Sequence, residues 1–303
     1  MKSRFLFPYQ LRPIGWILAI PGLVLGYLIV YRDYQIPGFG ILVKPPSPYY
    51  HGSLYQGLTP TLTLMLVVVG LFLIAFSKEK KEDELTTKMR QNALYWAVLI
   101  SYLLYVIWLL AVLALELFHL DKDPLGFFAD ISGMATYNLV TPLVIFIVRY
   151  YYLRYSRNGE YKVDKLFYLP EKPYKLLGKF ISVPLLLIVV FSFTGSWFFK
   201  GDMEPRDWME DLLLILPITL LIWGYSRQNN EDEFISTLRL ESMQLAVYLN
   251  YAILLIANLS LFYTNFLLVM VLNLGTIALF FVLRFTYILR TYNKENAKGE
   301  LAI

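Results

Sequence analysis

The sequence predicts an all-α polytopic membrane protein with eight transmembrane helices, built as two tandem four-helix modules. Three observations support this prediction. First, 57% of the 303 residues are hydrophobic and the mean hydropathy is +0.53. Second, the apolar residues come in blocks of about 18 or more, the length that crosses a hydrocarbon core about 30 Å thick. Third, one charged motif occurs twice, 149 residues apart.

The apolar blocks predict where the helices cross the membrane. Basic residues precede the first block but no small-residue cleavage site follows it, so we expect a retained helix and not a cleaved signal peptide. The long first outer loop, about 32–57, is rich in Pro, Gly and Tyr and is expected to lie at the membrane interface. The eight expected spans cover about 14–31, 58–77, 93–118, 133–153, 177–199, 209–226, 242–262 and 266–289.

The distribution of positive charge predicts the orientation. The segments that eight spans place on one side (1–13, 78–92, 149–179, 227–241 and 284–303) hold 22 of the 27 Lys and Arg residues. Cytoplasmic segments carry such an excess. Both termini are therefore expected in the cytoplasm. The net charge of +4 follows from this topology, so it gives no reason to expect a nucleic-acid partner.

The repeated motif divides the chain into its modules. Residues 82–90 are EDELTTKMR and residues 231–239 are EDEFISTLR, and each copy leads into an apolar helix in the same register. Matching residues elsewhere are offset by 163 in the first helix and by 135 in the last, as expected if the outer loops shortened after a duplication. The predicted modules are 1–153 and 173–303, joined by a basic linker at 154–172. Because each module has an even number of spans, a pseudo-twofold axis along the membrane normal should relate them.

Eight residues are candidate polar contacts between the modules: Asp83, Glu84, Arg90, Asp232, Glu233, Arg239, Asn138 and Asn273. Carboxylates at a helix start can simply cap the helix and complement its dipole, which explains the acidic part of the motif. Capping does not explain why an arginine recurs at the same place in both copies. A partly buried arginine without a partner is costly, so a partner is expected for each. We therefore expect crossed pairs, in which Glu84 or Asp83 meets Arg239, and Glu233 or Asp232 meets Arg90.

Polar and kinked positions within the spans leave two interpretations open. Asn138 and Asn273 lie early in the fourth and eighth spans, where an amide either bonds to a neighbouring helix or marks a functional site. Pro21 and Pro184 lie at matching positions of the first and fifth spans, which is a weak indication of the broken helices found in transporters.

Several chemistries are excluded or unsupported by the sequence. There is no cysteine, and the two histidines, His51 and His119, lie far apart in predicted outer loops. No glycine-rich phosphate loop, nucleophile elbow or metalloprotease motif occurs. The sequence therefore predicts no catalytic residues, no metal and no cofactor.

The second copy of the motif also carries a resemblance. Residues 231–235 (EDEFI), followed by 238–247 (LRLESMQLAV), resemble the core motif of small uncharacterised membrane proteins of Bacteroidota, each about as long as one module. Residues 15–16 (GW) and 21–22 (PG) are similar to the start of those proteins. The first copy departs from the pattern at 88–92 (KMRQN). The resemblance implies a bacterial inner membrane and no particular activity.

Two functions follow as alternatives. The missing catalytic groups favour a non-enzymatic inner-membrane protein, such as a sensory or regulatory subunit that acts through its cytoplasmic face. Its partners would be the lipid bilayer and another protein. The repeat, the two asparagines and the two prolines favour a small transporter or channel with a site between the modules. An integral-membrane enzyme acting on lipids is a more distant alternative.

Overall fold

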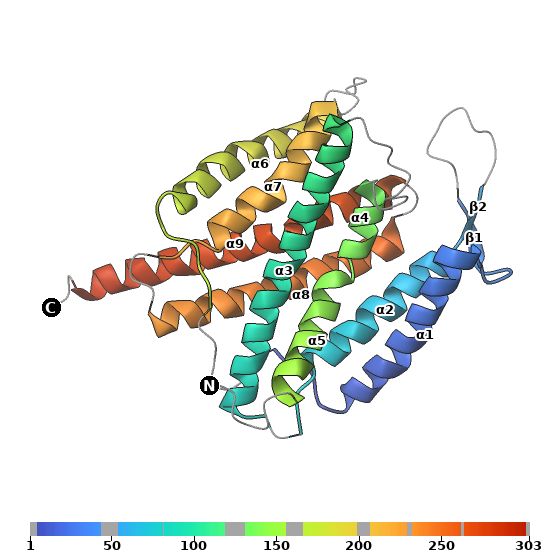
Figure 1. Cartoon of the computed structure of the whole chain (residues 1–303), viewed down its shortest axis with the longest axis horizontal. Coiled ribbons are helices and arrows are strands. Elements are labelled where there is room, and N and C mark those ends of the chain that lie inside the picture. Colours follow the sequence, from blue (N-terminus) through green and yellow to red (C-terminus); the bar gives the residue numbers. More distant parts are fainter. Residues whose placement is uncertain are drawn as a thin grey trace. The chain divides into compact units, whose positions relative to one another are not determined.

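The computed structural model describes residues 5–43, 54–80, 82–118, 131–155, 166–198, 207–228, 232–261 and 264–300 (Figure 1). The chain divides into two compact units. Unit 1 comprises Met1–Thr87 and Leu255–Phe266, and unit 2 comprises Lys88–Leu254 and Leu267–Ile303. These units rest on spatial contact and not on sequence similarity, so the module boundaries expected from the repeat stay a prediction.

The described residues are almost entirely helical, as the sequence predicts, with one two-stranded antiparallel hairpin that pairs Gly40 with Gly57 and Val43 with Leu54. The hairpin belongs to the segment expected to lie at the interface. In chain order the elements are α1 Leu11–Arg32, β1 Gly40–Val43, β2 Leu54–Gly57, α2 Thr59–Phe76, α3 Glu84–Leu117, α4 Ile131–Asn138, α5 Thr141–Tyr155, α6 Tyr174–Phe198, α7 Asp207–Gly224, α8 Glu233–Ser260 and α9 Thr264–Glu300.

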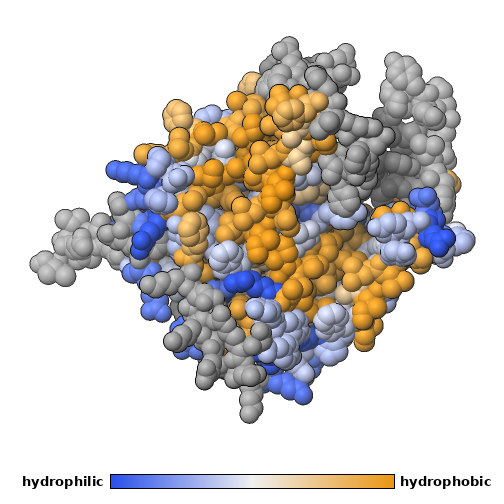
Figure 2. Space-filling model, in the orientation of Figure 1, coloured by the Kyte–Doolittle hydropathy of each residue, from blue (hydrophilic) through white to orange (hydrophobic). Residues whose placement is uncertain are grey.

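Seven stretches of described helix are long and apolar enough to cross a membrane. They lie in α1, α2, α3, α4 with α5, α6, α8 and α9, and the apolar part of α7 is shorter, at Leu212–Gly224. Large hydrophobic side chains also cover outward surfaces, as on α3, where Leu103, Ile107 and Leu110 are exposed (Figure 2). A water-soluble protein buries such side chains, whereas hydrocarbon solvates them.

Both charged motifs are helical from Glu84 and Glu233 onward. The third predicted span, 93–118, corresponds to the longer helix α3, which begins at Glu84 and ends at Leu117. The seventh, 242–262, corresponds to α8, which begins at Glu233 and ends at Ser260. Helix α9 also runs beyond the predicted end at 289, to Glu300. At 1.5 Å per residue its 37 residues extend about 55 Å, well beyond a hydrocarbon core of about 30 Å.

The fourth predicted span is a broken helix. Helix α4 ends at Asn138, residues 139 and 140 form a turn, and α5 begins at Thr141. Pro142 lies just after the break and has no N–H to donate to the carbonyl four residues earlier, at Asn138. The prolines at positions 21 and 184 interrupt neither α1 nor α6.

In unit 1, helices α1 and α2 pack closely through small residues. The buried residues of α1 are Gly15, Ala19 and Gly22, which share one helix face. A Cβ atom added at Gly15 would lie 2.8 Å from the carbonyl oxygen of Gly70, so only glycine permits this approach. Small residues at helix interfaces have this role in membranes, where dispersion contacts between backbones replace the hydrophobic effect.

In unit 2, tyrosine hydroxyls in the buried core join helices that are far apart in sequence. Tyr105 on α3 donates a hydrogen bond to the carbonyl of Leu214 on α7, at 2.8 Å. Tyr102 accepts one from the backbone N–H of Ala278 on α9, at 3.1 Å. Tyr225 donates one to the carbonyl of Tyr95, at 3.0 Å. A buried hydroxyl needs such a partner, so these bonds fix how the helices are aligned.

The same backbone arrangement occurs once in each unit. In unit 1, the N–H of Phe7 donates to the carbonyl of Phe76, and the N–H of Lys78 donates to the carbonyl of Phe7, both at 2.9 Å. In unit 2, the N–H of Leu169 donates to the carbonyl of Tyr225, and the N–H of Arg227 donates to the carbonyl of Leu169, both at 2.9 Å. In both units, the segment before a helix hairpin is thus tied to the end of the hairpin's second helix.

Candidate functional site

The aspartate of each motif copy caps a helix, as the simpler interpretation predicts. The Oδ1 atom of Asp83 accepts a hydrogen bond from the N–H of Thr86 at 2.7 Å, and the Oδ1 atom of Asp232 accepts one from Ile235, also at 2.7 Å. Each carboxylate satisfies an amide that the first turn of a helix leaves without an intrahelical partner. Asp83, Glu84, Asp232 and Glu233 are all exposed. These four carboxylates therefore lie on the surface.

The arginine of the second motif copy is fully buried in unit 2. The Nη1 atom of Arg239 donates to the carbonyl of Gly224 at 2.6 Å, and the Nη2 atom donates to that of Ser226 at 3.1 Å. Gly224 is the last residue of α7, where a helix leaves carbonyls without intrahelical donors. The guanidinium thus caps the C-terminus of α7, where its positive charge also complements the helix dipole.

Two aromatic rings complete the surroundings of Arg239. Its guanidinium carbon lies 4.4 Å from the ring centroid of Tyr168, which precedes α6, and 4.7 Å from that of Phe285 on α9. A planar guanidinium stacks well on aromatic faces. Arg239 therefore joins the chain before α6 and parts of α7, α8 and α9. None of these four partners was anticipated, although Gly224 at the end of an apolar run is a sequence signal for a helix terminus.

Arg90, the arginine of the first copy, is also buried, at 5% exposure. Its guanidinium lies 5.4 Å from the ring centroid of Tyr150 on α5. Tyr150 and Phe285 are 135 residues apart, the offset that the sequence predicts between the last helices of the two modules. The crossed pairing of these arginines with carboxylates of the other copy stays a prediction.

The two asparagines lie in different surroundings. Asn273, on α9, is buried, and its Oδ1 atom accepts a hydrogen bond at 3.3 Å from the Nδ2 atom of Asn250 on α8. The hydroxyl of Thr276 donates both to the Oδ1 atom of Asn250 and to the carbonyl of Asn273. Asn138 is half-buried at the end of α4, beside the break before Pro142. A polar cluster thus surrounds Asn273, while Asn138 lies at a helix end.

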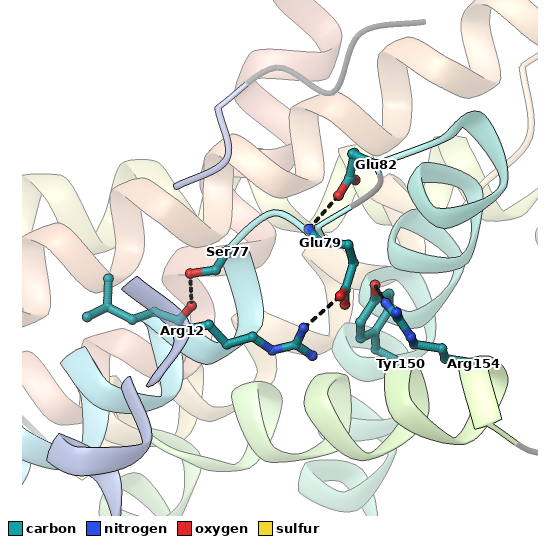
Figure 3. A network of polar contacts seen from close by, with 7 residues as sticks. Arg12, Ser77, Glu79, Glu82, Tyr150 and Arg154 are labelled. Atoms are coloured by element: carbon teal, nitrogen blue, oxygen red, sulfur yellow. Dashed lines mark hydrogen bonds and ion pairs between the residues drawn. The ribbon is translucent and has the colours of Figure 1, made fainter. Parts of the chain in front are cut away.

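A charged network in unit 1 connects the start of α1 with the chain after α2 (Figure 3). The Nη1 atom of Arg12 lies 2.8 Å from the Oε2 atom of Glu79, and their side chains are 13% and 5% exposed. The backbone N–H of Glu79 donates to the Oε2 atom of Glu82 at 2.9 Å. In unit 2, Lys175 donates to the Oε1 atom of Gln228 and to that of Glu171, both at 2.7 Å.

Within the described residues, no group of three His, Cys, Asp or Glu side chains is placed to hold a metal ion. His51 and His119 lie outside the described residues.

These features define a class of protein. Helices long and apolar enough to span a bilayer, with hydrophobic outward faces and polar groups gathered at helix ends, belong to a multi-pass helical membrane protein. No protein-family model, curated protein or solved structure matches the chain.

Proposed function

We propose that the protein is a non-enzymatic component of the bacterial inner membrane with eight spans in two tandem modules and both termini in the cytoplasm. Contacts that recur at the predicted offsets support the tandem arrangement. The Arg12–Glu79 pair corresponds to Lys175 and Gln228, and Arg90 on Tyr150 corresponds to Arg239 on Phe285. The bridges of Phe7 and Leu169 are similar, although these two residues are 162 and not 163 positions apart. A pseudo-twofold axis along the membrane normal would relate such modules.

The eighth span of this proposal is α7. Its 18 residues extend about 27 Å, slightly less than an average hydrocarbon core. The short apolar part, Leu212–Gly224, follows three acidic residues among the first five of the helix, Asp207, Glu210 and Asp211. Counting α7 as a span keeps the Lys and Arg excess on one side of the membrane, as the positive-inside rule requires.

We further propose that the protein acts as a sensory or regulatory subunit through a surface at the start of α8. This proposal depends on a difference in burial between residues of the second motif copy. Asp232, Glu233 and Phe234 are exposed, Phe234 at 46%, whereas Arg239, less than two turns later, is fully buried. The buried residue stabilises the fold, and the exposed residues offer an apolar ring beside two carboxylates. A basic, partly apolar protein segment would complement this surface.

The test is purification of tagged protein from its host in mild detergent, with mass spectrometry of the proteins retained. We expect a stoichiometric partner that is retained by the wild type, reduced by Glu233→Gln and lost with Glu233→Lys. Asp33→Asn is the matched control for Glu233→Gln, because it removes one exposed carboxylate from the expected outer side. A partner retained equally by all four proteins, or no partner at all, would contradict the proposal.

The alternative, a small transporter or channel, is favoured by one specific observation. Asn250, Asn273 and Thr276 place amide and hydroxyl groups together in the buried core of unit 2. If they line a pathway, purified protein in proteoliposomes should carry an ion or small solute, and Asn273→Leu should lower the flux at least tenfold. Absence of flux for every ion and solute tested would eliminate the alternative. The three side chains would then serve only to satisfy one another's hydrogen bonds.

A further inference from the structure

A cluster of hydrogen-bond donors lies in unit 2, between α3 and the last two turns of α5. Asn92 on α3 is 2% exposed, and its Oδ1 atom accepts a hydrogen bond from the Nη2 atom of Arg149 at 3.1 Å. The guanidinium of Arg149 lies 5.0 Å from the ring centroid of Trp96. Asn92 and Trp96 are four residues apart and are therefore neighbours on one face of α3.

Two donors in this cluster have no acceptor among the described residues. The Nδ2 atom of Asn92 and the Nε1 atom of Trp96 are both inaccessible to solvent and make no hydrogen bond there. Burying an N–H group without an acceptor is unfavourable, so two such groups beside one guanidinium need an explanation. An amide NH₂, an indole N–H and a guanidinium together form a donor set that suits an anion with several oxygen atoms.

The second copy of the motif differs from the first at the positions that form this donor cluster. At the offsets of the repeat, Glu241 takes the position of Asn92, Arg284 that of Arg149, and Leu245 that of Trp96. The second copy thus has a carboxylate where the first has a neutral amide, and an apolar side chain where the first has an extra donor.

We propose that Asn92, Trp96 and Arg149 form a binding site for a phosphate group, either that of a lipid headgroup or free phosphate. Arginine matches the geometry of phosphate oxygens, and the tryptophan N–H adds a directional donor. The site adjoins the lipid-facing surface of α5, where Val148 and Tyr152 on either side of Arg149 are each 62% exposed. Arg149 also lies six residues before the end of that helix at Tyr155, and headgroups are found near the ends of membrane-spanning helices. This proposal requires only that the chain spans a membrane.

The decisive variant is Asn92→Glu, which copies Glu241 into the first module and supplies an internal competitor for the anion. Full-length protein would be placed in nanodiscs of phosphatidylglycerol or of a neutral glucosyl diacylglycerol, and retained lipid counted by native mass spectrometry. We expect the wild type to retain phosphatidylglycerol at least tenfold more strongly than the neutral lipid, and Asn92→Glu to abolish this preference.

Two further variants separate loss of binding from loss of fold. Trp96→Phe keeps the ring under the guanidinium but removes the N–H, and should weaken retention severalfold. Glu241→Gln makes the reverse change, from a carboxylate to an amide, at the matching position of the second copy and should leave retention unchanged. Thermal unfolding of each variant identifies any that is misfolded. Unaltered retention in both Asn92→Glu and Trp96→Phe would overturn the site, as would retention that does not depend on the phosphate group.

Inorganic phosphate distinguishes the two sources of the anion. If millimolar phosphate displaces phosphatidylglycerol from the wild type, and radiolabelled phosphate binds wild type but not Asn92→Glu, the site accepts free phosphate. If the lipid resists displacement, the site recognises the headgroup together with its acyl chains. If neither phosphate nor phosphatidylglycerol binds, the proposal is wrong.

Discussion

Replacing Arg239 with alanine is expected to destabilise the protein by about 3 kcal/mol or more. The change removes hydrogen bonds to the carbonyls of Gly224 and Ser226 and leaves both buried, at about 1–3 kcal/mol for each unsatisfied group. It also removes the stacking on Tyr168 and Phe285, which adds about 1 kcal/mol or more when the guanidinium is desolvated. In a thermal unfolding scan in detergent, a loss of this size lowers the midpoint by about 10 °C.

Two companion variants show whether geometry or charge matters at this position. Arg239→Lys keeps the charge but lacks the planar fork that reaches two carbonyls, so it should recover less than half of the loss. Arg227→Ala removes an arginine that is exposed, and should change stability by no more than about 0.5 kcal/mol. Equal midpoints for Arg239→Ala and Arg227→Ala would show that the guanidinium does not cap α7.

Gly178→Ala is expected to have the second largest effect, through the contact of α6 with α7. The added Cβ would lie 2.7 Å from the backbone nitrogen of Trp223 and 2.9 Å from its Cα. Backbone atoms cannot move aside as a flexible side chain can, so the two helices must separate. Overpacking of this kind costs about 1–3 kcal/mol, and the better helix propensity of alanine offsets less than about 1 kcal/mol of it.

Gly275→Ala is the matched control, because the nearest atoms to its Cβ would all belong to Pro217, the closest being Cγ at an ordinary 3.4 Å. This variant should leave the unfolding midpoint unchanged or raise it slightly. Gly15→Ala, in the matching position of the first copy, should act like Gly178→Ala, since its Cβ would lie 2.8 Å from the carbonyl of Gly70. A midpoint for Gly178→Ala at or above that of Gly275→Ala would contradict the close approach of α6 and α7.

Local features of the chain were predictable because their causes are local. Runs of apolar residues require helices in a bilayer, since each helix satisfies its own backbone. The caps at Asp83 and Asp232 depend only on residues within one turn, and the sequence anticipated this kind of contact. The long helices through both motifs were likewise expected from the periodicity of the residues they share.

Local sequence alone did not predict which prolines interrupt a helix. The helices continue through Pro21 and Pro184 but break before Pro142, although all three lie within apolar stretches. Every proline removes one backbone hydrogen bond. Whether the helix bends slightly or ends depends on the neighbouring helices that satisfy the freed carbonyl, and those neighbours come from distant parts of the chain.

The sequence alone thus determined the membrane class, most helix positions and the internal similarity, because hydropathy and helix capping act over short distances. Only the tertiary structure decided the partners of Arg239, the bond between Asn250 and Asn273, and the donor cluster at Asn92. Each of these joins segments 13 to 71 residues apart, through the rotation and depth of one helix against another. Side chains that are apolar on nearly every face leave that rotation unspecified until the helices pack.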